Sequence, residues 1–285
     1  MTQYAVTAAS GKLAAEVVKS LSAMIGPEKV VGLARTPGKA NSLGVEIRPG
    51  DYEKPAELKS SLAGVEAVLL ISGMDAPDKR VGQHRNVIEA AKAAGVQRIV
   101  YTSIQGLDEG TAFSSVVSSN RQTEQDVQES ELQWSIGRNG IYIEPDIEYI
   151  DNYKRAGEIA NCAGDGKCGY TTRPELGFAY AKMLAETTHH GRTYNLHGAS
   201  LSQTELANFL SDAFKTRLRY RPMTVEAYRE ERIEELGEFL GTVISGIYEG
   251  IQKGGVDNES HFAAAAGREH RSWESFFGEL SQRAI

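Results

Sequence analysis

Long apolar runs, cysteines and blocks of positive charge are all scarce in this chain of 285 residues. No apolar run approaches the roughly 18 residues that cross a membrane, and the N-terminus lacks the basic and apolar segments of a signal peptide. The net charge is -7 and no cluster of Lys and Arg stands out, which argues against a nucleic-acid partner. The cysteines Cys162 and Cys168 are too few for a disulfide framework or a zinc site. We therefore expect a cytoplasmic protein with free thiols and no metal, membrane or nucleic-acid partner.

The first half of the chain alternates short apolar segments with amphipathic segments of helical period. The pattern predicts strands at 4–7, 30–34, 45–50, 67–72, 98–103 and 133–139, and helices at 12–24, 81–95 and 118–132. Strands that alternate with helices are typical of βαβ units, and apolar runs without strict alternation fit strands covered on both faces. The sequence therefore predicts an α/β fold with a Rossmann-type, doubly wound parallel sheet.

The pattern changes after about residue 150. A helix is expected at 174–187, a strand at 193–198, and a further helix with Ser202 as N-cap and Glu205 completing a capping box. The segment 224–285 is mostly of helical type. We predict a dinucleotide-binding domain over 1–152 and a smaller, mainly helical substrate-binding region over 153–285. Some elements of this second region are expected to return to the sheet.

The first apolar segment ends in a turn of small residues, Ala8-x-x-Gly11-x-x-Ala14. Such a turn lets a diphosphate approach the backbone and lets the helix pack closely on the strand. Gly11 and Ala14 satisfy these needs, whereas the methyl group of Ala8 opposes a positive φ. The N–H groups of residues 10–13 would point at an anion at the helix N-terminus, where Lys12 adds a positive charge. The alternative is a turn that only packs a βαβ unit.

The end of the second predicted strand carries cations and no acid. An enzyme that uses NAD has Asp or Glu at this place to hold the ribose hydroxyls. This chain instead has Arg35 and Lys39, whose charges suit a 2′-phosphate. The pattern favours NADP(H), with NAD(H) left open. The other interpretation is that both are solvated surface charges.

Several stretches together resemble one family. They are "ARTPGKA" (34–40), "RPGDYEKPAEL" (48–58), "QHRNVIEAAKAAGVQRIVYTS" (83–103), "GRNGIYIE" (137–144) and "TTRPELGFAYA" (171–181). Their order and spacing resemble the NmrA-like branch of the atypical short-chain dehydrogenases, and within it the group of type 2 NAD(P)H:quinone oxidoreductases and triphenylmethane dye reductases. The resemblance implies an N-terminal domain that binds NADP(H), with the substrate in the cleft against the small C-terminal domain.

By position, the resemblance implies contacts along the whole cofactor. It predicts a phosphate turn, a 2′-phosphate site, an adenine border and a nicotinamide side, made in that order by Ala8, Ser10, Gly11, Lys12 and Leu13, by Arg35 and Lys39, by Asp51 and Tyr52, and by Ile71, Ser72, Gly73, Tyr101, Thr102 and Asn139. The family pattern has glycine at the first and third places of the turn, where this chain has alanine.

The catalytic pair of a typical short-chain dehydrogenase is missing. That pair is Tyr-x-x-x-Lys, in which the lysine lowers the pKa of the tyrosine that protonates a carbonyl. Asn120 and Glu124 stand at the matching positions, and neither can do that work. The quinone and dye reductases that the chain resembles lack the pair too. An electron-poor acceptor takes hydride directly, so the enzyme mainly positions donor and acceptor.

If an acid is needed, the candidates are Ser103, Tyr142 and Tyr149, of which Ser103 and Tyr142 lead. Each also has an ordinary interpretation, since Ser103 can cap or turn the chain and a tyrosine after a buried strand can be a core ring. The residues expected to line the substrate site are Met74, Tyr142, Glu144 and Tyr149.

The leading hypothesis is an NAD(P)H-dependent oxidoreductase that transfers hydride to a quinone, a conjugated carbonyl or a dye-like aromatic compound. The expected partner is a small aromatic molecule, and a homodimer is left open. The alternatives are a dehydrogenase of a specific alcohol or ketone, and a regulator that senses NADP without catalysis.

Overall fold

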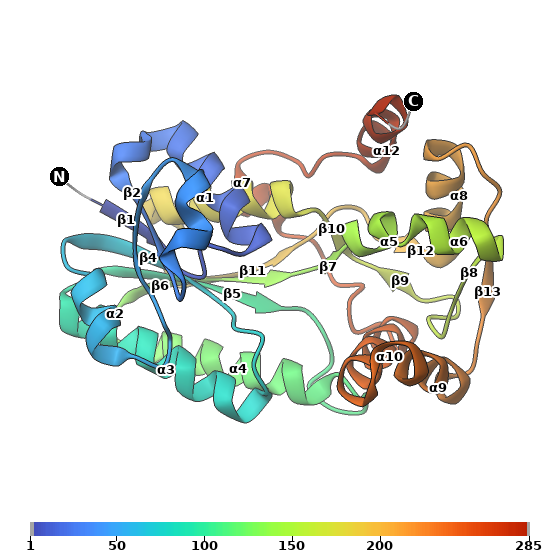
Figure 1. Ribbon diagram of the computed structural model, residues 1–285, viewed down its shortest axis with the longest axis horizontal. Helices are drawn as coiled ribbons and strands as arrows, with labels where there is room; N and C mark the ends of the chain where they lie inside the picture. The colour runs from blue at the N-terminus through green and yellow to red at the C-terminus, as the bar shows by residue number, and fades with distance from the viewer. Residues whose placement is uncertain (1–2, 284–285) are drawn as a thin grey trace.

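The central feature of the computed structural model, which describes residues 3–283, is a seven-stranded parallel sheet (Figure 1). Its order is β11-β6-β5-β4-β1-β2-β3. The strands are β1 (Gln3–Val6), β2 (Val30–Ala34), β3 (Glu46–Pro49), β4 (Val65–Ile71), β5 (Arg98–Ile104), β6 (Gln133–Asn139) and β11 (Arg192–Leu196). The order reverses between β1 and β4, where such sheets open a crevice at their carboxyl edge. The predicted doubly wound Rossmann-type sheet is confirmed.

Helices cover both faces of the sheet. Figure 1 shows α1 (Lys12–Ile25) and α7 (Arg173–Ala185) above it, and α2 (Pro55–Ser61), α3 (Pro77–Ala94) and α4 (Ser114–Gln128) below it. Successive strand residues alternate between two cores, so that Leu69 packs under α1 and α7 whereas Val68 and Leu70 pack against α3 and its neighbours. Burial on both faces explains why the strands are continuous apolar runs.

Two helices begin earlier than predicted. The helix expected from residue 81 starts at Pro77, because proline fits the first helical turn, and the helix expected from 118 starts at Ser114. The capping box of α8 (Gln203–Ala213) is confirmed, since the Ser202 hydroxyl accepts from the Glu205 N–H at 3.2 Å and the Glu205 carboxylate accepts from the Ser202 N–H at 2.7 Å.

The rest of the chain lies at the carboxyl edge of the sheet (Figure 1). Its helices are α5 (Glu144–Glu148), α6 (Ile150–Ala156), α9 (Val225–Leu236), α10 (Glu238–Gln252) and α12 (Trp273–Arg283), together with α8. The short helix α11 (Phe262–Ala266) packs instead on α7 and β11, in the core of the sheet. Short strands join them in the pairs β7–β10, β9–β12 and β8–β13, formed by Ile141–Tyr142 with Tyr170–Thr171, Lys167–Cys168 with Leu201–Ser202, and Glu158–Asn161 with Arg219–Pro222. These pairs were not predicted, because strands so short carry too few residues to show a period. The 3₁₀ segments are η1 (Pro27–Lys29), η2 (Pro37–Leu43) and η3 (Thr187–His189).

This second region has a core of its own, built around Ile143, Tyr170, Leu206, Ile251 and Trp273. Although they follow residue 152, α7 and β11 lie with the sheet. Cys162 and Cys168 are buried free thiols, as predicted. Across residues 3–283 no helix has the length and apolarity to cross a membrane, and no His, Cys, Asp and Glu cluster could bind a metal.

Candidate cofactor and substrate site

The turn after β1 has the geometry of an anion site. Ala8 adopts a φ of 51°, in the left-handed region, and its carbonyl oxygen accepts the Gly11 N–H at 2.8 Å. This φ costs an alanine on the order of 1 kcal/mol. Gly11 is the N-cap of α1, and no side chain caps the helix, so the N–H groups of its first turn are available to a phosphate.

Two cations lie beside this turn and share one carboxylate. The Lys12 ammonium is 2.8 Å from Oε1 of Glu148 in α5, and the Arg173 guanidinium is 3.7 Å from the same atom. These contacts lower the pKa of the Glu148 carboxyl, the Lys12 hydrogen bond most of all. Lys12 and Glu148 are exposed, so their pair stabilises the fold little. Arg173 shares Glu148 with Lys12 and is therefore a second cation beside the turn.

The residues predicted to bind the adenosine end of the cofactor include two cations that are unpaired among the described residues. Arg35 and Lys39 are both exposed, and neither has an ion-pair partner within residues 3–283. Tyr52 turns its hydroxyl inward, where it lies 2.5 Å from the Thr7 hydroxyl and donates to the Ile71 carbonyl oxygen at 2.8 Å. Only its ring is therefore left to border an adenine. Asp51 accepts the Glu53 N–H at 3.1 Å and lies at the start of this loop.

His84 orders the loop after β4, which is predicted to lie on the nicotinamide side of the cofactor. Burial lowers the pKa of His84 to about 3, so the ring is neutral. Its Nε2 accepts the Gly73 N–H at 2.9 Å, which leaves Nδ1 to donate to the Thr123 hydroxyl at 2.9 Å. The Ser72 N–H donates to the Thr102 hydroxyl at 2.9 Å. This role of His84 could not be predicted, because the sequence around a helical histidine does not show which loop it will contact in the fold.

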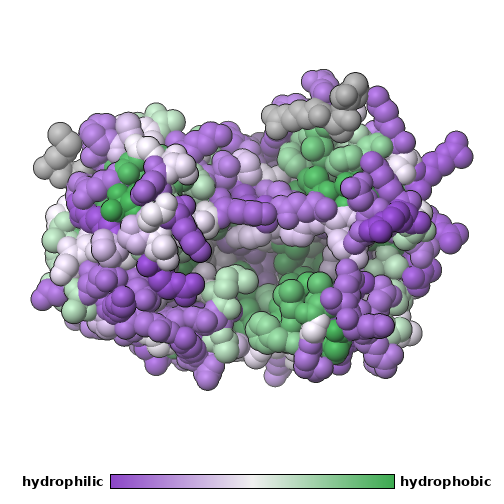
Figure 2. All heavy atoms as spheres, viewed as in Figure 1, coloured by the Kyte–Doolittle hydropathy of each residue, from purple (hydrophilic) through white to green (hydrophobic). Residues whose placement is uncertain are grey.

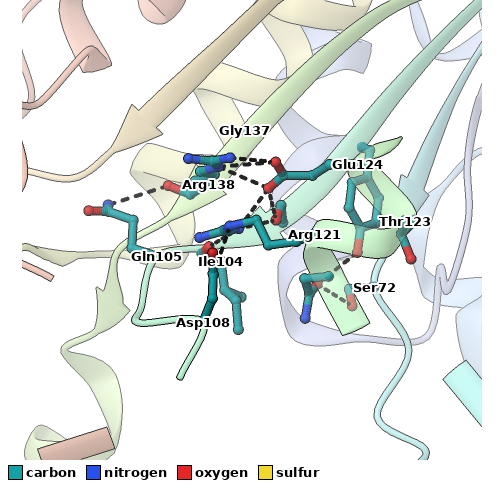
Figure 3. A network of polar contacts seen from close by, with 12 residues as sticks. Ser72, Ile104, Gln105, Asp108, Arg121, Thr123, Glu124, Gly137 and Arg138 are labelled. Carbon is teal, nitrogen blue, oxygen red and sulfur yellow. Dashed lines mark hydrogen bonds and ion pairs between the residues drawn. The ribbon is translucent and has the colours of Figure 1, made fainter. Parts of the chain in front are cut away.

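The positions of the missing catalytic pair are filled by a closed polar cluster (Figure 3). Asn120 is 1% exposed and accepts hydrogen bonds from Tyr101 at 2.7 Å and Ser72 at 3.1 Å. Glu124 accepts from Arg121 at 2.7 Å and from Arg138 at 2.6 Å. Figure 3 shows both guanidinium groups converging on its carboxylate. The amide oxygen of Asn120 and the carboxylate of Glu124 are thus both engaged in hydrogen bonds within the cluster.

Ser103 and Tyr101 belong to the same cluster. Both are fully buried, and the Ser103 hydroxyl donates to Oε1 of Glu124 at 2.5 Å. The structure therefore places the hydroxyl of Ser103 inside the protein. Its catalytic role, and the cofactor contact of Tyr101, stay predictions of the sequence.

Tyr142 lies between the sheet and the second region. Its hydroxyl accepts from the Asn139 amide at 3.1 Å, and Tyr180 donates to the Asn139 oxygen at 2.5 Å. Burial raises the pKa of Tyr142 to about 12, so the phenol is protonated at neutral pH. Glu144 accepts the Arg173 N–H at 2.6 Å, while its second oxygen is buried without a hydrogen-bond partner in the structure. This oxygen is an acceptor left without a partner among the described residues.

A cavity of about 480 Å³ continues from Tyr142 into the second region. It is walled by β7, α5, α6, α9 and α10, and Figure 2 shows a hollow on this face with hydrophobic atoms along its lower side. Tyr142 and Tyr149, predicted to line the substrate site, both line it, whereas Met74 and Glu144 do not. Met74 is 89% exposed on the loop after β4.

Comparison with known proteins assigns the class. Residues 8–159 match the family described as NAD(P)H-binding. The chain is 34% identical over 262 residues, 90% of each chain, to Quinone oxidoreductase 2 of Escherichia coli (strain K12). It is 29% identical to the NAD(P)H azoreductase of Xenophilus azovorans, over 79% of this chain and 78% of that protein. The chain therefore belongs to the NAD(P)H-binding family of NmrA-like short-chain dehydrogenases, as the resemblance implied.

Solved structures agree with this placement. The NADPH complex of the Escherichia coli NADPH-dependent quinone oxidoreductase superposes with a TM-score of 0.90 at 30% identity, covering 98% of this chain and 99% of that one. The NADP(H) complex of the Citrobacter sp. triphenylmethane reductase gives 0.89 at 28% identity, over 99% and 100%. Within the family, the chain is similar to the quinone and dye reductases.

Proposed function

We propose that this chain is an NADPH-dependent oxidoreductase that transfers hydride to a flat, electron-poor acceptor such as a quinone or an aromatic dye. The observation that carries the proposal is the position of Tyr142. Its hydroxyl is bonded to Asn139 at the end of β6, and its ring lines the 480 Å³ cavity. An acceptor in this cavity would therefore lie next to Asn139, a predicted cofactor contact, which supports the proposal.

The residues present fit NADPH. The uncapped start of α1, with Lys12 and Arg173 beside it, suits the diphosphate. Arg35 and Lys39, which have no ion-pair partner in the described residues, suit the 2′-phosphate. The unpaired oxygen of Glu144 can accept a hydrogen bond from a carboxamide. When bound, the cofactor supplies the hydride.

The chain's own residues position the reactants more than they move protons. Ser103 is occupied by Glu124, and the Tyr142 phenol, with its raised pKa, is a weak acid. An acceptor that needs a strong protein acid, such as a simple ketone, is therefore a poor substrate. Relatives named quinone oxidoreductase and azoreductase support an acceptor that is itself electron-poor. A small aromatic substrate, a homodimer and a cytoplasmic location are parts of this proposal.

The test is oxidation of NADPH with menadione as acceptor, followed by the loss of NADPH absorbance. Steady turnover supports the proposal. Tight binding of NADPH without turnover of any acceptor would instead favour a regulator that senses the nucleotide.

The cofactor assignment is tested with Arg35→Glu. This variant should weaken NADPH binding by at least about tenfold and NADH binding much less, because only NADPH carries the 2′-phosphate. The matched control is Arg217→Glu, an exposed arginine after α8 that should change neither. Equal losses for both nucleotides would contradict the placement of the 2′-phosphate.

A further inference from the structure

The charged side chains that line the cavity differ in whether they have an ion-pair partner. Most of them pair with each other across its rim: Arg221 lies 2.6 Å from Glu158, and Arg232 lies 2.6 Å from Glu231 and 2.7 Å from Glu235. Glu158 also pairs with Arg219 at 3.3 Å, so three arginines balance three glutamates and these pairs leave no excess charge. Asp146 is the lining acid that has no ion-pair partner within residues 3–283.

Asp146 is held in the wall of the cavity. It lies in α5 and is 4% exposed. Tyr153 of α6 donates to its Oδ1 at 2.7 Å, and Tyr248 of α10 bonds to it as well. Burial raises the pKa of the Asp146 carboxyl to about 6, and the bonds from the two tyrosines oppose that rise. At neutral pH the cavity therefore holds a carboxylate without a counter-charge.

The groups that face Asp146 from the other packed elements are neutral. They are Tyr153 of α6, Tyr228 of α9, Tyr248 of α10, Cys168 of β9 and Tyr170 of β10, and burial raises the pKa of each. None of them can compensate the charge of Asp146 or titrate near neutral pH.

Aromatic rings and an apolar mouth complete the cavity. Tyr149 stands edge-on to Tyr153 with ring centres 5.2 Å apart, and Tyr228 stands edge-on to Tyr248 at 5.3 Å. Ring faces attract cations. At the junction of α9 and α10, Leu236 and Leu240 line the cavity and are 36% and 44% exposed, so an apolar body can enter from solvent.

We propose that Asp146 is a specificity-determining residue of this cavity, which favours a cationic aromatic acceptor over a neutral one by pairing with its positive charge. This proposal rests on the function proposed above. Tyrosine faces and the two leucines contact the apolar rings, while the carboxylate supplies the counter-charge that the cavity otherwise lacks.

The chemistry balances without a protein acid. Hydride adds to the electron-poor carbon of the cation and forms a C–H bond, and the displaced π-electron pair cancels the positive charge. The cation is reduced by two electrons, NADPH is oxidised to NADP⁺, and no proton is taken up. The product is neutral and loses its attraction to Asp146, so reduction itself weakens product binding. A catalytic pair of the Tyr-Lys type has no work to do in this reaction.

The experiment compares a cationic triphenylmethane dye with neutral menadione, each reduced by NADPH, in the wild type and in Asp146→Asn. The amide keeps the size of the side chain and an oxygen that can accept from Tyr153. We expect kcat/KM for the dye to fall at least about tenfold, mostly through KM, and kcat/KM for menadione to change little. The control is Asp151→Asn on α6, which removes the same charge from an exposed aspartate that does not line the cavity.

A pH profile gives a second readout. In the wild type, kcat/KM for the dye should rise with the ionisation of Asp146 near pH 6, and Asp146→Asn should abolish that rise while menadione shows none. Tyr153→Phe removes one bond to the carboxylate and should move the rise to higher pH, which keeps the proposal testable if Asp146→Asn fails to fold.

The outcomes separate the two proposals. Equal effects of Asp146→Asn on dye and menadione would overturn the selection of cations, as would turnover of menadione with no turnover of the dye. In both cases the oxidoreductase function stands. Bound NADPH with no turnover of either acceptor would overturn the oxidoreductase itself.

Discussion

Two buried acids define two kinds of polar site in this molecule. Glu124, under the carboxyl ends of β5 and β6, bonds to Arg121, Arg138 and Ser103 at 2.5 to 2.7 Å. Asp146, in the wall of the cavity, bonds only to tyrosines among the described residues. Their side chains are similarly buried, yet one has two counter-charges and the other has none.

The difference separates a structural cluster from a binding site. A buried charge is tolerated when partners and hydrogen bonds compensate it, and Glu124 is compensated within the fold. Asp146 lowers stability by staying ionised in a cavity, and such cost is typical of residues kept for function. The two positions of the missing catalytic pair are thus part of the scaffold, and the uncompensated charge lies in the cavity that we propose for the acceptor.

The largest expected effect is that of Glu124→Gln. Removing the charge leaves Arg121 and Arg138 without their shared partner, so we expect the free energy of unfolding to fall by roughly 3–5 kcal/mol. Urea denaturation measures the loss. Glu109→Gln, an exposed glutamate on the loop after β5, is the control and should change stability little. The folded fraction of the Glu124 variant should keep most of its kcat. Lost turnover at unchanged stability would instead show that Glu124 acts in catalysis and not in stabilising the fold.

The effect of Asp146→Asn on stability should have the opposite sign. The carboxyl pKa rises from 3.8 to about 6 on folding, so the ionised form destabilises the native state above pH 6, and this cost disappears as pH falls toward 3.8. The variant should be more stable than the wild type by on the order of 1–3 kcal/mol at neutral pH. Denaturation at neutral pH and at about pH 4 checks the sign, because the difference should shrink in acid. A destabilised variant at neutral pH would place Asp146 with the structural cluster.

The smallest effect is expected at Ala8, where the strain lies in the backbone and not in an unpaired charge. Ala8→Gly removes the strain of φ 51° but adds freedom to the unfolded chain, so we expect a gain of about 1 kcal/mol or less. Ala15→Gly in the interior of α1 is the control and should lose about 1 kcal/mol. Tighter NADPH binding by Ala8→Gly, measured by calorimetry, would show that the same strain acts on the cofactor turn; a loss of stability would show that the alanine conformation is not strained.

Much of the cofactor half could be predicted from sequence. Its strands are long and apolar, its helices amphipathic, and its turn carries small residues at fixed spacing, so the local pattern repeats the global fold. Arg35 and Lys39 were singled out by their place after β2, and their contact with a 2′-phosphate stays a prediction. The acceptor half was predicted less well: Tyr142 and Tyr149 were expected to line the substrate site and do line the cavity, but Asp146 was not expected there.

The sequence by itself determined the parallel sheet, the small-residue turn after β1 and the absence of the Tyr-Lys pair, because these depend on residues close together in the chain. Only the tertiary structure decided which polar groups are compensated. Glu124 of α4 pairs with Arg138 of β6, whereas Asp146 of α5 bonds to Tyr248 of α10 and has no ion-pair partner within residues 3–283. Charge compensation depends on distances in space, and a chain that folds back on itself makes those distances independent of separation in sequence.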